Sequence, residues 1–549
     1  MKNHSKFLIV LFVLAMSISL LSGCKPATTE EPIAPVAPEE TEATEIEESE
    51  PTEAPVATEE PRVQKDTIIM AQDSDVVSMD PHHGKLTTDH NVNRHIYSTL
   101  LPAAATDSGG VPTAGLAESY EQTSDTSYKF YLRKNVTFHD GSPFTAADVK
   151  FALERAVNSP YVKNTAKFIA SVEIVDDYTV IVNTTAPYAP SIAAFSLNHI
   201  AIVPKAYIEA NGDDYFALNP VGTGPYKFVE WVVGDHITLE AYDGYFDTEN
   251  MPPTKNLIIR IIPESTQRAI ALENGEIDFA VNLSATDLDT LSTNEEITTI
   301  VGSYGNVHMM MFNLNQPPFD NYAVREAITY AIDRAAILQA VYGGYGLISE
   351  STIAPKIWGY PNHDFKGYEY DVEVAKAKLA DAGFGDGFSA TLTVQNAAQF
   401  IEMGTIIQSM LKEIGIEISV EPLDNSELLP RFNEGKYDFA ITSWNNVTGD
   451  ADVVYYALMH SSSMGAAGNR AFINSPELDA LLDGARAEVN SIENRQKLYN
   501  DVYDLHRNEI LAYFPVVMSS YLYAASNNIE DYSINVGLYV RFASARVFE

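Results

Sequence analysis

The only cysteine of the chain, Cys24, stands where its thiol could carry a lipid. It ends the run Leu21-Ser22-Gly23-Cys24, which follows an apolar stretch over residues 7–20 with Lys2 and Lys6 near its start. Small residues before the cysteine, and an apolar run shorter than the about 20 residues of a membrane span, are typical of a cleaved lipoprotein signal. We therefore expect a signal over residues 1–23 and a lipid anchor on Cys24, rather than an uncleaved anchor or a buried free thiol.

Histidines form the second group that could do chemistry, at His82, His83, His90 and His95. Neutral imidazoles bind nickel and other late transition metals. No pair of them is spaced i, i+4 on one helical face, and no cysteine accompanies them. We therefore expect exposed or hydrogen-bonded histidines, and we predict neither a metal site nor a cofactor.

Motifs of common enzyme classes are missing from the sequence. It contains no Gly-x-Ser-x-Gly elbow, no His-Glu-x-x-His pair, no Gly-Lys-Ser/Thr phosphate loop, and no cysteine nucleophile once Cys24 is lipidated. Carboxylate pairs are so numerous in an acidic chain that they do not identify a glycosidase. We predict a protein that is not an enzyme, with an extracellular hydrolase as a remote alternative.

The charge of the chain restricts its partners. The formal charge is -40, and Arg62–Glu549 alone keep -31, because the preceding residues hold three Lys and twelve Glu. Nucleic acids and anionic lipid surfaces need clustered Lys and Arg, so both are excluded as partners. With no cysteine after Cys24, the folded part must depend on a large core instead of disulfides.

An acidic segment separates the cysteine from the folded part. Thr28–Pro61 hold twelve Glu and six Pro with no basic residue. Charge repulsion and proline both favour an extended chain, so we interpret residues 24–63 as a disordered stalk. An acidic tail that binds a partner is the alternative.

From Asp66 onward, short strand patterns alternate with amphipathic helices, which predicts a mixed α/β fold. We expect a helix capped by Thr145 and Asp148, with apolar residues from Val149 to Val157 at helical spacing. A second helix follows Asp320 with the same spacing. The expected strands are Thr67–Ala71, Tyr128–Leu132, Val172–Ile174, Thr179–Val182 and His236–Glu240.

Several sequence blocks resemble family 5 extracellular solute-binding proteins of ABC importers, which include oligopeptide-, dipeptide- and nickel-binding members. The main block runs from Leu132 to Val149 and reads LRKNVTFHDGSPFTAADV. The others follow in the family order, and the resemblance spans about residues 65–520. They are Gly222–Tyr226, Glu273–Asp278, Met311–Asn315, Pro318–Arg334, Asn433–Asp438 and Arg495–Tyr499.

The resemblance implies a two-lobed periplasmic-binding-protein-like fold, type II, cluster C, with mixed sheets, hinge strands and an extra subdomain. We expect lobe I over residues 64–308, with the subdomain at about 103–217. Lobe II is expected over residues 309–512, with a return to lobe I over 513–549. Hinge strands are placed near Val307–Phe312 and Leu511–Met518.

The resemblance places the ligand beside Thr442, Ser443 and Trp444. In peptide-binding relatives the equivalent strand pairs with an extended peptide, which is β-augmentation. Relatives that anchor a free amine carry an Asp three residues after the Trp, where this chain has Val447.

The loop after Trp444 supplies the other candidates on this side. Asn445 and Asn446 offer a neutral polar loop, whereas Asp450 or Asp452 could reach a cation. Asp450 as a cap of the helix that starts at Ala451 is the open alternative.

The remaining candidates are Asp73, in the early loop of lobe I, and Tyr345. Tyr345 stands with Tyr342, Trp358 and Tyr360 around a glycine-rich stretch, which makes an aromatic-lined cleft plausible.

Taken with the family resemblance, these residues predict a monomeric, lipid-anchored binding protein at the outer face of the cytoplasmic membrane. It would close on a peptide and deliver it to a membrane permease, without chemistry. An oligosaccharide or other small polar solute, and a nickel complex, remain as alternatives.

Overall fold

The computed structural model describes residues 62–84, 86–101, 115–302, 306–365, 367–445, 449–534 and 539–549. The predicted signal, Cys24 and nearly all of the predicted stalk lie outside the described residues, as does Asn446. Arg62–Glu549 form one compact unit.

A seven-stranded mixed sheet is the frame of lobe I, in the order β10-β17-β9-β1-β8-β7-β6. Its centre is β1, which pairs in parallel with β8 and β9 and buries Ile68 and Met70 completely. The predicted first strand is thus confirmed. The strands are β1 Thr67–Gln72, β6 Tyr226–Val232, β7 His236–Ala241, β8 Asn256–Ile261, β9 Phe279–Ala280, β10 Ile297–Val301 and β17 Leu522–Ser526.

A four-stranded antiparallel sheet, ordered β2-β3-β5-β4, forms within the range predicted for the subdomain. Its strands are β2 Ala117–Ser124, β3 Ser127–Leu132, β4 Ile169–Asp176 and β5 Thr179–Thr184, so the predicted strands of this region are confirmed. The helices before β10 are α1 Thr87–Ile96, α2 Ala146–Asn158, α3 Lys163–Ala166, α4 Ser191–Ala194, α5 Lys205–Asn211, α6 Asp213–Leu218, α7 Ser265–Glu273 and α8 Ala285–Leu291.

Helix α2 has the N-terminal cap and the buried apolar face that its sequence predicts. The Asp148 carboxylate accepts hydrogen bonds from the Thr145 backbone amide at 2.9 Å and from the Thr145 hydroxyl at 3.1 Å. This satisfies donors that a helix start leaves free. Val149 and Leu153 are fully buried on the inner face of the helix, as predicted.

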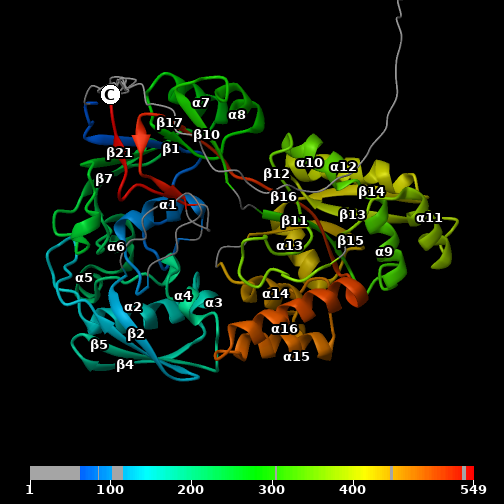
Figure 1. Ribbon diagram of the computed structural model, residues 1–549, viewed down its shortest axis with the longest axis horizontal. Coiled ribbons are helices and arrows are strands. Elements are labelled where there is room, and N and C mark those ends of the chain that lie inside the picture. Colours follow the sequence, from blue (N-terminus) through cyan, green and yellow to red (C-terminus); the bar gives the residue numbers. More distant parts are fainter. Residues whose placement is uncertain are drawn as a thin grey trace, which may run out of the picture. The chain divides into compact units, whose positions relative to one another are not determined.

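Lobe II is built on a six-stranded sheet ordered β12-β16-β11-β15-β13-β14. The strands are β11 Asn306–Phe312, β12 Gly346–Ile348, β13 Phe388–Gln395, β14 Ile416–Leu423, β15 Phe439–Asn445 and β16 Tyr513–Ser519. Every side chain from Val307 to Phe312 is buried, because β11 lies between two strands and has helices on both faces of its sheet (Figure 1).

The helices of lobe II include the second predicted helix, which is confirmed as α9 with Asn321 as its N-cap. Their bounds are α9 Tyr322–Ala331, α10 Arg334–Tyr342, α11 Val372–Asp381, α12 Ala398–Lys412, α13 Asn425–Glu434, α14 Asp452–Met459, α15 Pro476–Ala487 and α16 Ile492–Leu505. A π-helical turn, His506–Ile510, extends α16 into β16.

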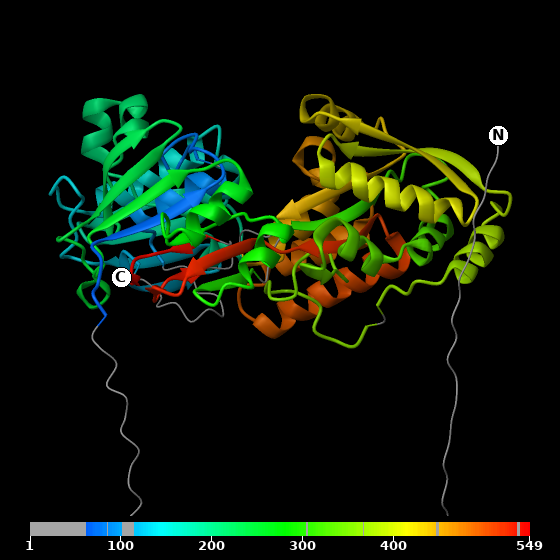
Figure 2. The same cartoon turned by 90° about the horizontal axis from the view of Figure 1, so that it is seen from above.

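The chain changes sheet twice. It leaves the lobe I sheet after β10 and enters the lobe II sheet at β11; it leaves β16 and returns as β17, as Figure 2 shows for the C-terminal strands. The predicted return to lobe I began at residue 513, but β16 pairs with β11 and β12 and therefore belongs to the lobe II sheet. The second crossing lies at Ser520 and Tyr521, between β16 and β17.

Short strand pairs close the C-terminal end: β18 Ile529–Glu530 with β21 Arg546–Val547, and β19 Ser533–Ile534 with β20 Val540–Arg541. Among the residues that the structure describes, no helix has the length and apolar character needed to span a bilayer.

Candidate functional site

Strand β15, predicted as the ligand-facing strand, has one open side. It pairs with β11 along its full length, from Phe312↔Phe439 to Asn306↔Asn445. On the other side β13 pairs with it only through Leu392↔Phe439 and Thr393↔Ala440. Among described residues, Ile441–Asn445 therefore have a strand neighbour on one side only. An unpaired strand edge offers backbone N–H and C=O groups to an extended ligand.

The predicted contact residues lie on this open segment. Thr442, Ser443, Trp444 and Asn445 are all half-buried, while Phe439 and Ala440 before them are fully buried. Trp444 packs at the edge of the lobe II core that contains Val307 and Met309. The half-exposed indole leaves part of an aromatic face for a ligand.

The structure corrects the roles expected of Asp450 and Asp452, because both are buried and paired inside lobe II. Arg495 donates to both oxygens of Asp450 at 2.7 and 2.8 Å, and the Asp452 backbone amide donates to one of them at 2.9 Å. Arg486 donates to both oxygens of Asp452 at 2.9 and 2.8 Å. Neither carboxylate is left for the ammonium group of a ligand. Helix α14 has Ala451 as its N-cap, so Asp450 supports the turn before the helix.

Arg495 also accounts for the position of Trp358, one of the aromatic residues predicted to line the cleft. Its guanidinium stacks 4.3 Å from the centre of the indole ring, and Trp358 exchanges backbone hydrogen bonds with Gly449 and Ala451. Trp358 therefore holds the loop after β15 in place. Sequence spacing alone gave no sign of this, because Arg495 lies 45 residues beyond Asp450.

Tyr345 of lobe II and Asp73 of lobe I both contact residues of lobe I. The Tyr345 hydroxyl donates to Asp289 of α8 at 2.5 Å, and its ring packs on the small core that contains Ala71. Asn282 donates to Asp73 at 3.0 Å. Tyr345 therefore connects lobe II to lobe I beside the loop that carries Asp73.

Tyr521 was not among the predicted site residues, although it lies on the second crossing between the sheets. Burial raises the pKa of its hydroxyl and the Asp73 carboxylate raises it further, while hydrogen bonds with Thr87 and Asn306 oppose this. Asn306 is the register partner of Asn445. Tyr521 thus brings together the start of α1, the loop of Asp73 and the open end of β15.

Comparison with known proteins decides the family. The family model for bacterial extracellular solute-binding proteins, family 5 Middle, matches residues 111–466. The chain belongs to this family.

Two curated relatives and one solved structure illustrate the similarity. Heme-binding protein A of Haemophilus influenzae is 31% identical over 76% of this chain and 81% of its own. The dipeptide-binding protein of Escherichia coli is 30% identical over 70% of this chain and 77% of its own. The structure of HbpA2 from Haemophilus parasuis, 25% identical, superposes with a TM-score of 0.80 and covers 88% of this chain and all of that one. The predicted two-lobed fold is therefore confirmed, and these relatives are binding proteins, not enzymes.

In this solute-binding protein the clustered histidines are mostly buried and hydrogen-bonded. His82 contacts the Ala201 carbonyl at 3.0 Å, and His95 contacts the Asn91 carbonyl at 2.8 Å. His90 pairs with His199, their Nε2 atoms 3.1 Å apart, and burial lowers the pKa of His90 well below its ordinary value. The described residues contain no group of three or more His, Cys, Asp or Glu placed to hold a metal ion.

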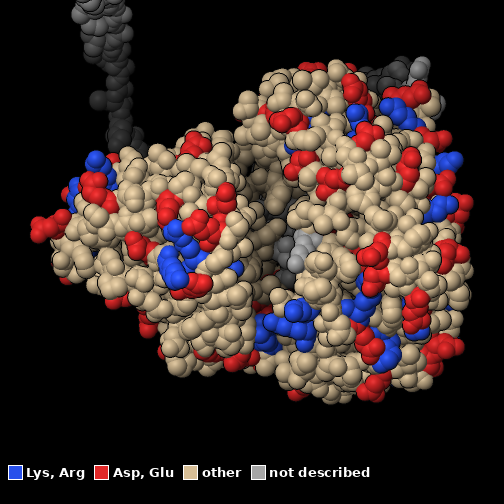
Figure 3. Space-filling model, turned by 180° about the vertical axis from the view of Figure 1, so that it is seen from behind, with Lys and Arg blue, Asp and Glu red and all other residues tan. Residues whose placement is uncertain are grey.

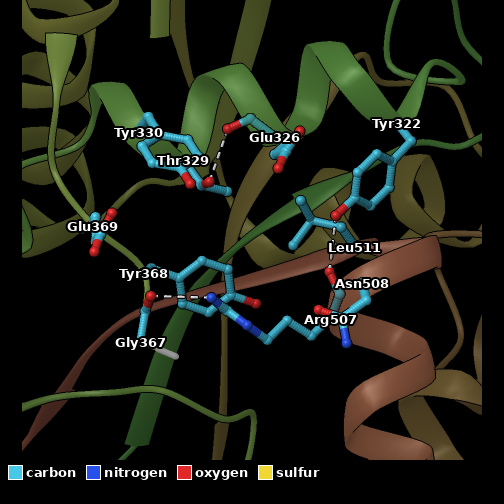
Figure 4. Close-up of a pocket in the computed structure, with 10 residues that line it drawn as sticks. All are labelled: Tyr322, Glu326, Thr329, Tyr330, Gly367, Tyr368, Glu369, Arg507, Asn508 and Leu511. Carbon is cyan, nitrogen blue, oxygen red and sulfur yellow. Dashed lines mark hydrogen bonds between the residues drawn. The ribbon is translucent and has the colours of Figure 1, made fainter. Parts of the chain in front are cut away.

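A small polar pocket of the solute-binding protein, about 70 Å³, lies beside α9, and none of its lining residues belongs to β15 (Figure 4). Arg507 crosses it, donates to the Gly367 carbonyl at 3.0 Å and stacks 3.9 Å from the centre of the Tyr368 ring. The volume is that of a few water molecules, which is too small for a peptide.

The surface of the solute-binding protein carries acidic and basic side chains intermixed. Figure 3 shows Asp and Glu scattered over the displayed face of the body, with Lys and Arg among them. This agrees with the excess of acidic residues in the sequence, and it gives no continuous basic surface on that face.

Proposed function

We propose that the protein is the substrate-binding component of an ABC importer that captures peptides. The unpaired side of β15 supports this most directly. Five consecutive residues, Ile441–Asn445, have a strand partner on one side only in the described structure. A peptide that adds a strand there is held by main-chain hydrogen bonds, which do not depend on its sequence.

Several neighbouring groups are placed to assist such a ligand. Thr442, Ser443, Trp444 and Asn445 lie on the open segment, and Asn446 follows them in the chain. Tyr521 and Asp73 lie on the lobe I side of the same region. Asn306, which interacts with Tyr521, is the register partner of Asn445 and so connects them to β15. Tyr345 is proposed as a contact between the lobes and Asp73 as a polar ligand contact. The amine anchor is not assigned to Asp450 or Asp452, because arginines occupy both.

Lobe closure supplies the proposed mechanism. A ligand that touches both lobes only in the closed form stabilises that form, and a membrane permease can recognise it. The two crossings beside β11 and at Ser520 and Tyr521 are the proposed hinge. No bond of the solute is made or broken in this process.

The relative that binds dipeptides supports a peptide, and the relative named for heme keeps a larger organic solute as an alternative. An oligosaccharide remains an alternative because of the polar side chains on and after β15. A nickel complex is less well supported, because the described residues contain no group of three or more His, Cys, Asp or Glu placed to hold a metal ion.

We further propose that Cys24 carries a lipid and that residues 24–63 form a stalk, so that the monomeric body stands at the outer face of the cytoplasmic membrane. The sequence pattern supports this anchor. A Cys24→Ser variant is expected to lose the lipid mass and to leave the membrane fraction, with the wild type as the control. Retention of Cys24→Ser in the membrane would contradict the anchor.

Native mass spectrometry tests the solute. The full-length protein is measured as purified from cells and again after a pool of short peptides is added. Adducts at peptide masses are expected. Adducts of a sugar, a heme or a metal, with none of a peptide, would contradict the peptide assignment while leaving a solute-binding role.

A further inference from the structure

Most buried arginines in this protein have their donors satisfied. Arg268 donates to the carbonyls of Val281, Ile262, Pro263 and Asn282 at 2.5 to 3.0 Å. Arg325 likewise donates to three carbonyls, and Arg495 to Asp450 and the Ala485 carbonyl. Such partners offset the cost of removing a cation from water.

Arg94 on α1 departs from this pattern. It is 9% exposed, yet its only hydrogen bond in the described structure runs from Nε to the His90 carbonyl at 3.2 Å. The guanidinium lies 4.4 Å from the centre of the Tyr539 ring. Both terminal nitrogens are left without a described partner, although they are the donors that bind carboxylates best.

A second arginine, Arg541, lies beside Arg94. It belongs to β20, which is held on α1 by a hydrogen bond from the Phe542 amide to His95 Nε2 at 3.1 Å. Its buried Nε atom has no hydrogen-bond partner. Burial, the larger cause, and the nearby Arg541 guanidinium together lower the pKa of Arg94 to about 9. The two cations therefore repel each other.

No ion pair joins either arginine to a carboxylate of the described residues. Asp247 and Tyr245 attract Arg541 electrostatically, but neither forms a hydrogen bond with it. The body carries 63 Asp and Glu, since twelve of the 75 precede it, so carboxylates are not scarce. Arg94, which is buried, and Arg541, which is half-buried, thus have no carboxylate partner among the described residues, and their terminal nitrogens are left to bind an anion supplied by a solute.

The same helix face points to the ligand region. Thr87, Asn91 and Arg94 are spaced i, i+4 and i+7, so they share one face of α1. Thr87 bonds Tyr521, which also contacts Asn306 beside the open end of β15. On this face, Asn91 Oδ1 is buried without a partner.

We propose that Arg94 and Arg541 form a carboxylate-binding site for the captured solute. The fork of each guanidinium can bind both oxygens of a carboxylate, and the exchange of repulsion for attraction favours binding. This inference rests on the proposed function and specifies its solute, which carries at least one carboxylate. For a peptide, that group is the C-terminus or an acidic side chain.

Matched peptides test the site. Affinities of the full-length wild type, Arg94→Gln and Arg541→Gln are measured by calorimetry for one peptide found to bind, with a free C-terminus and no acidic side chain, and for its C-terminal amide. We expect the wild type to prefer the acid at least tenfold. Each variant should lose most of that preference and bind the amide as the wild type does. The control Arg431→Gln, a surface arginine paired with Glu421 and Glu427, should keep the preference.

Several outcomes would overturn the inference. A wild type that binds acid and amide equally leaves the peptide function intact but removes the carboxylate site. A variant that loses both peptides equally shows a structural role for the arginine.

A second measurement covers the case in which no peptide binds, which defeats the proposed peptide function. Thermal unfolding midpoints are then compared in sodium succinate and in sodium chloride at equal ionic strength. Stabilisation by succinate of the wild type, but not of Arg94→Gln, supports the arginine site for another carboxylate. Equal responses of the two proteins overturn it.

Discussion

Two regions of this protein bury charge in opposite ways. After β15, Asp450 and Asp452 are each held by an arginine through two hydrogen bonds. In lobe I, the buried Arg94 of α1 and the half-buried Arg541 of β20 lie beside each other without a carboxylate partner in the described structure. The first region contains its own counterions, whereas the second has no carboxylate partner among the described residues.

The difference shows how to separate framework from site in an acidic binding protein. Carboxylates were the obvious candidates for binding a charged ligand, and the sequence offered many of them. Two of them, Asp450 and Asp452, instead bind arginines and hold the segment after β15 in place. Groups with unmet hydrogen-bonding capacity therefore indicate function better than groups of a suitable type.

The largest effect is expected where the first region is broken. Asp450→Ala leaves Arg495 buried without its carboxylate, which should lower the free energy of unfolding by about 3–5 kcal/mol. Urea unfolding followed by circular dichroism measures this. Asp501→Ala, which removes only a surface pair with Lys497, is the control and should change little. A loss from Asp450→Ala as small as that of the control would show that the buried pair does not hold the loop.

The pH dependence of stability tests His95, a residue of α1 whose ring nitrogens both have hydrogen-bond partners. Burial lowers the pKa of His95 to about 3, so the folded state stays neutral while the unfolded state takes up a proton below about pH 6.5. Stability from this group is therefore full above pH 6.5 and falls toward pH 3. Between pH 6.5 and 5 the loss is about 2 kcal/mol.

In His95→Gln the unfolding free energy should fall less steeply with pH over that range. The change in slope should correspond to the loss of about one proton taken up on unfolding, and chemical unfolding at a series of pH values measures it. His236 on the surface provides the opposite control, because its hydrogen bond with Asp235 raises its pKa. His236→Gln should therefore steepen the fall. An unchanged slope for His95→Gln would mean that His95 titrates alike in both states.

Trp444→Ala sharpens the comparison on the open side of β15. Removing a half-buried indole from the ligand side should weaken binding of a captured peptide about tenfold, about 1.4 kcal/mol, with the fold retained. Trp231→Ala is a matched control, since Trp231 lies on β6 and bonds Asp75 at 3.0 Å. It should leave peptide affinity unchanged. Equal affinities of Trp444→Ala and the wild type in calorimetry would move the ligand away from β15.

The smallest effect is expected at a cap that serves only the fold. Asp333 accepts a hydrogen bond from the Ala336 amide at 3.0 Å at the start of α10. Asp333→Ala should cost about 1 kcal/mol of unfolding free energy, with unchanged ligand affinity. Asp381→Ala, which changes the last residue of α11, is the comparison and should cost less unfolding free energy. A change in affinity would place Asp333 among the site residues.

Local patterns predicted much of the fold. The capping pair Thr145 and Asp148 and the apolar spacing from Val149 located α2, because a helix start is specified by residues three apart. The predicted strands of both lobe I sheets were found because short apolar runs bounded by turn residues are also local patterns. The boundary at residue 513 differed, since β16 joins its sheet through β11, some 200 residues earlier, and local sequence carries no record of that pairing.

The sequence alone determined the family, the mixed α/β class and the segment that carries β15, because these depend on local patterns and on blocks of adjacent residues. Tertiary structure decided which charges are free. Asp450 meets Arg495, and Arg94 meets Arg541, across 45 and more than 400 residues of sequence. Whether a charge is paired depends on such distant contacts, and therefore only the folded chain distinguishes a paired framework carboxylate from a guanidinium that has no carboxylate partner among the described residues.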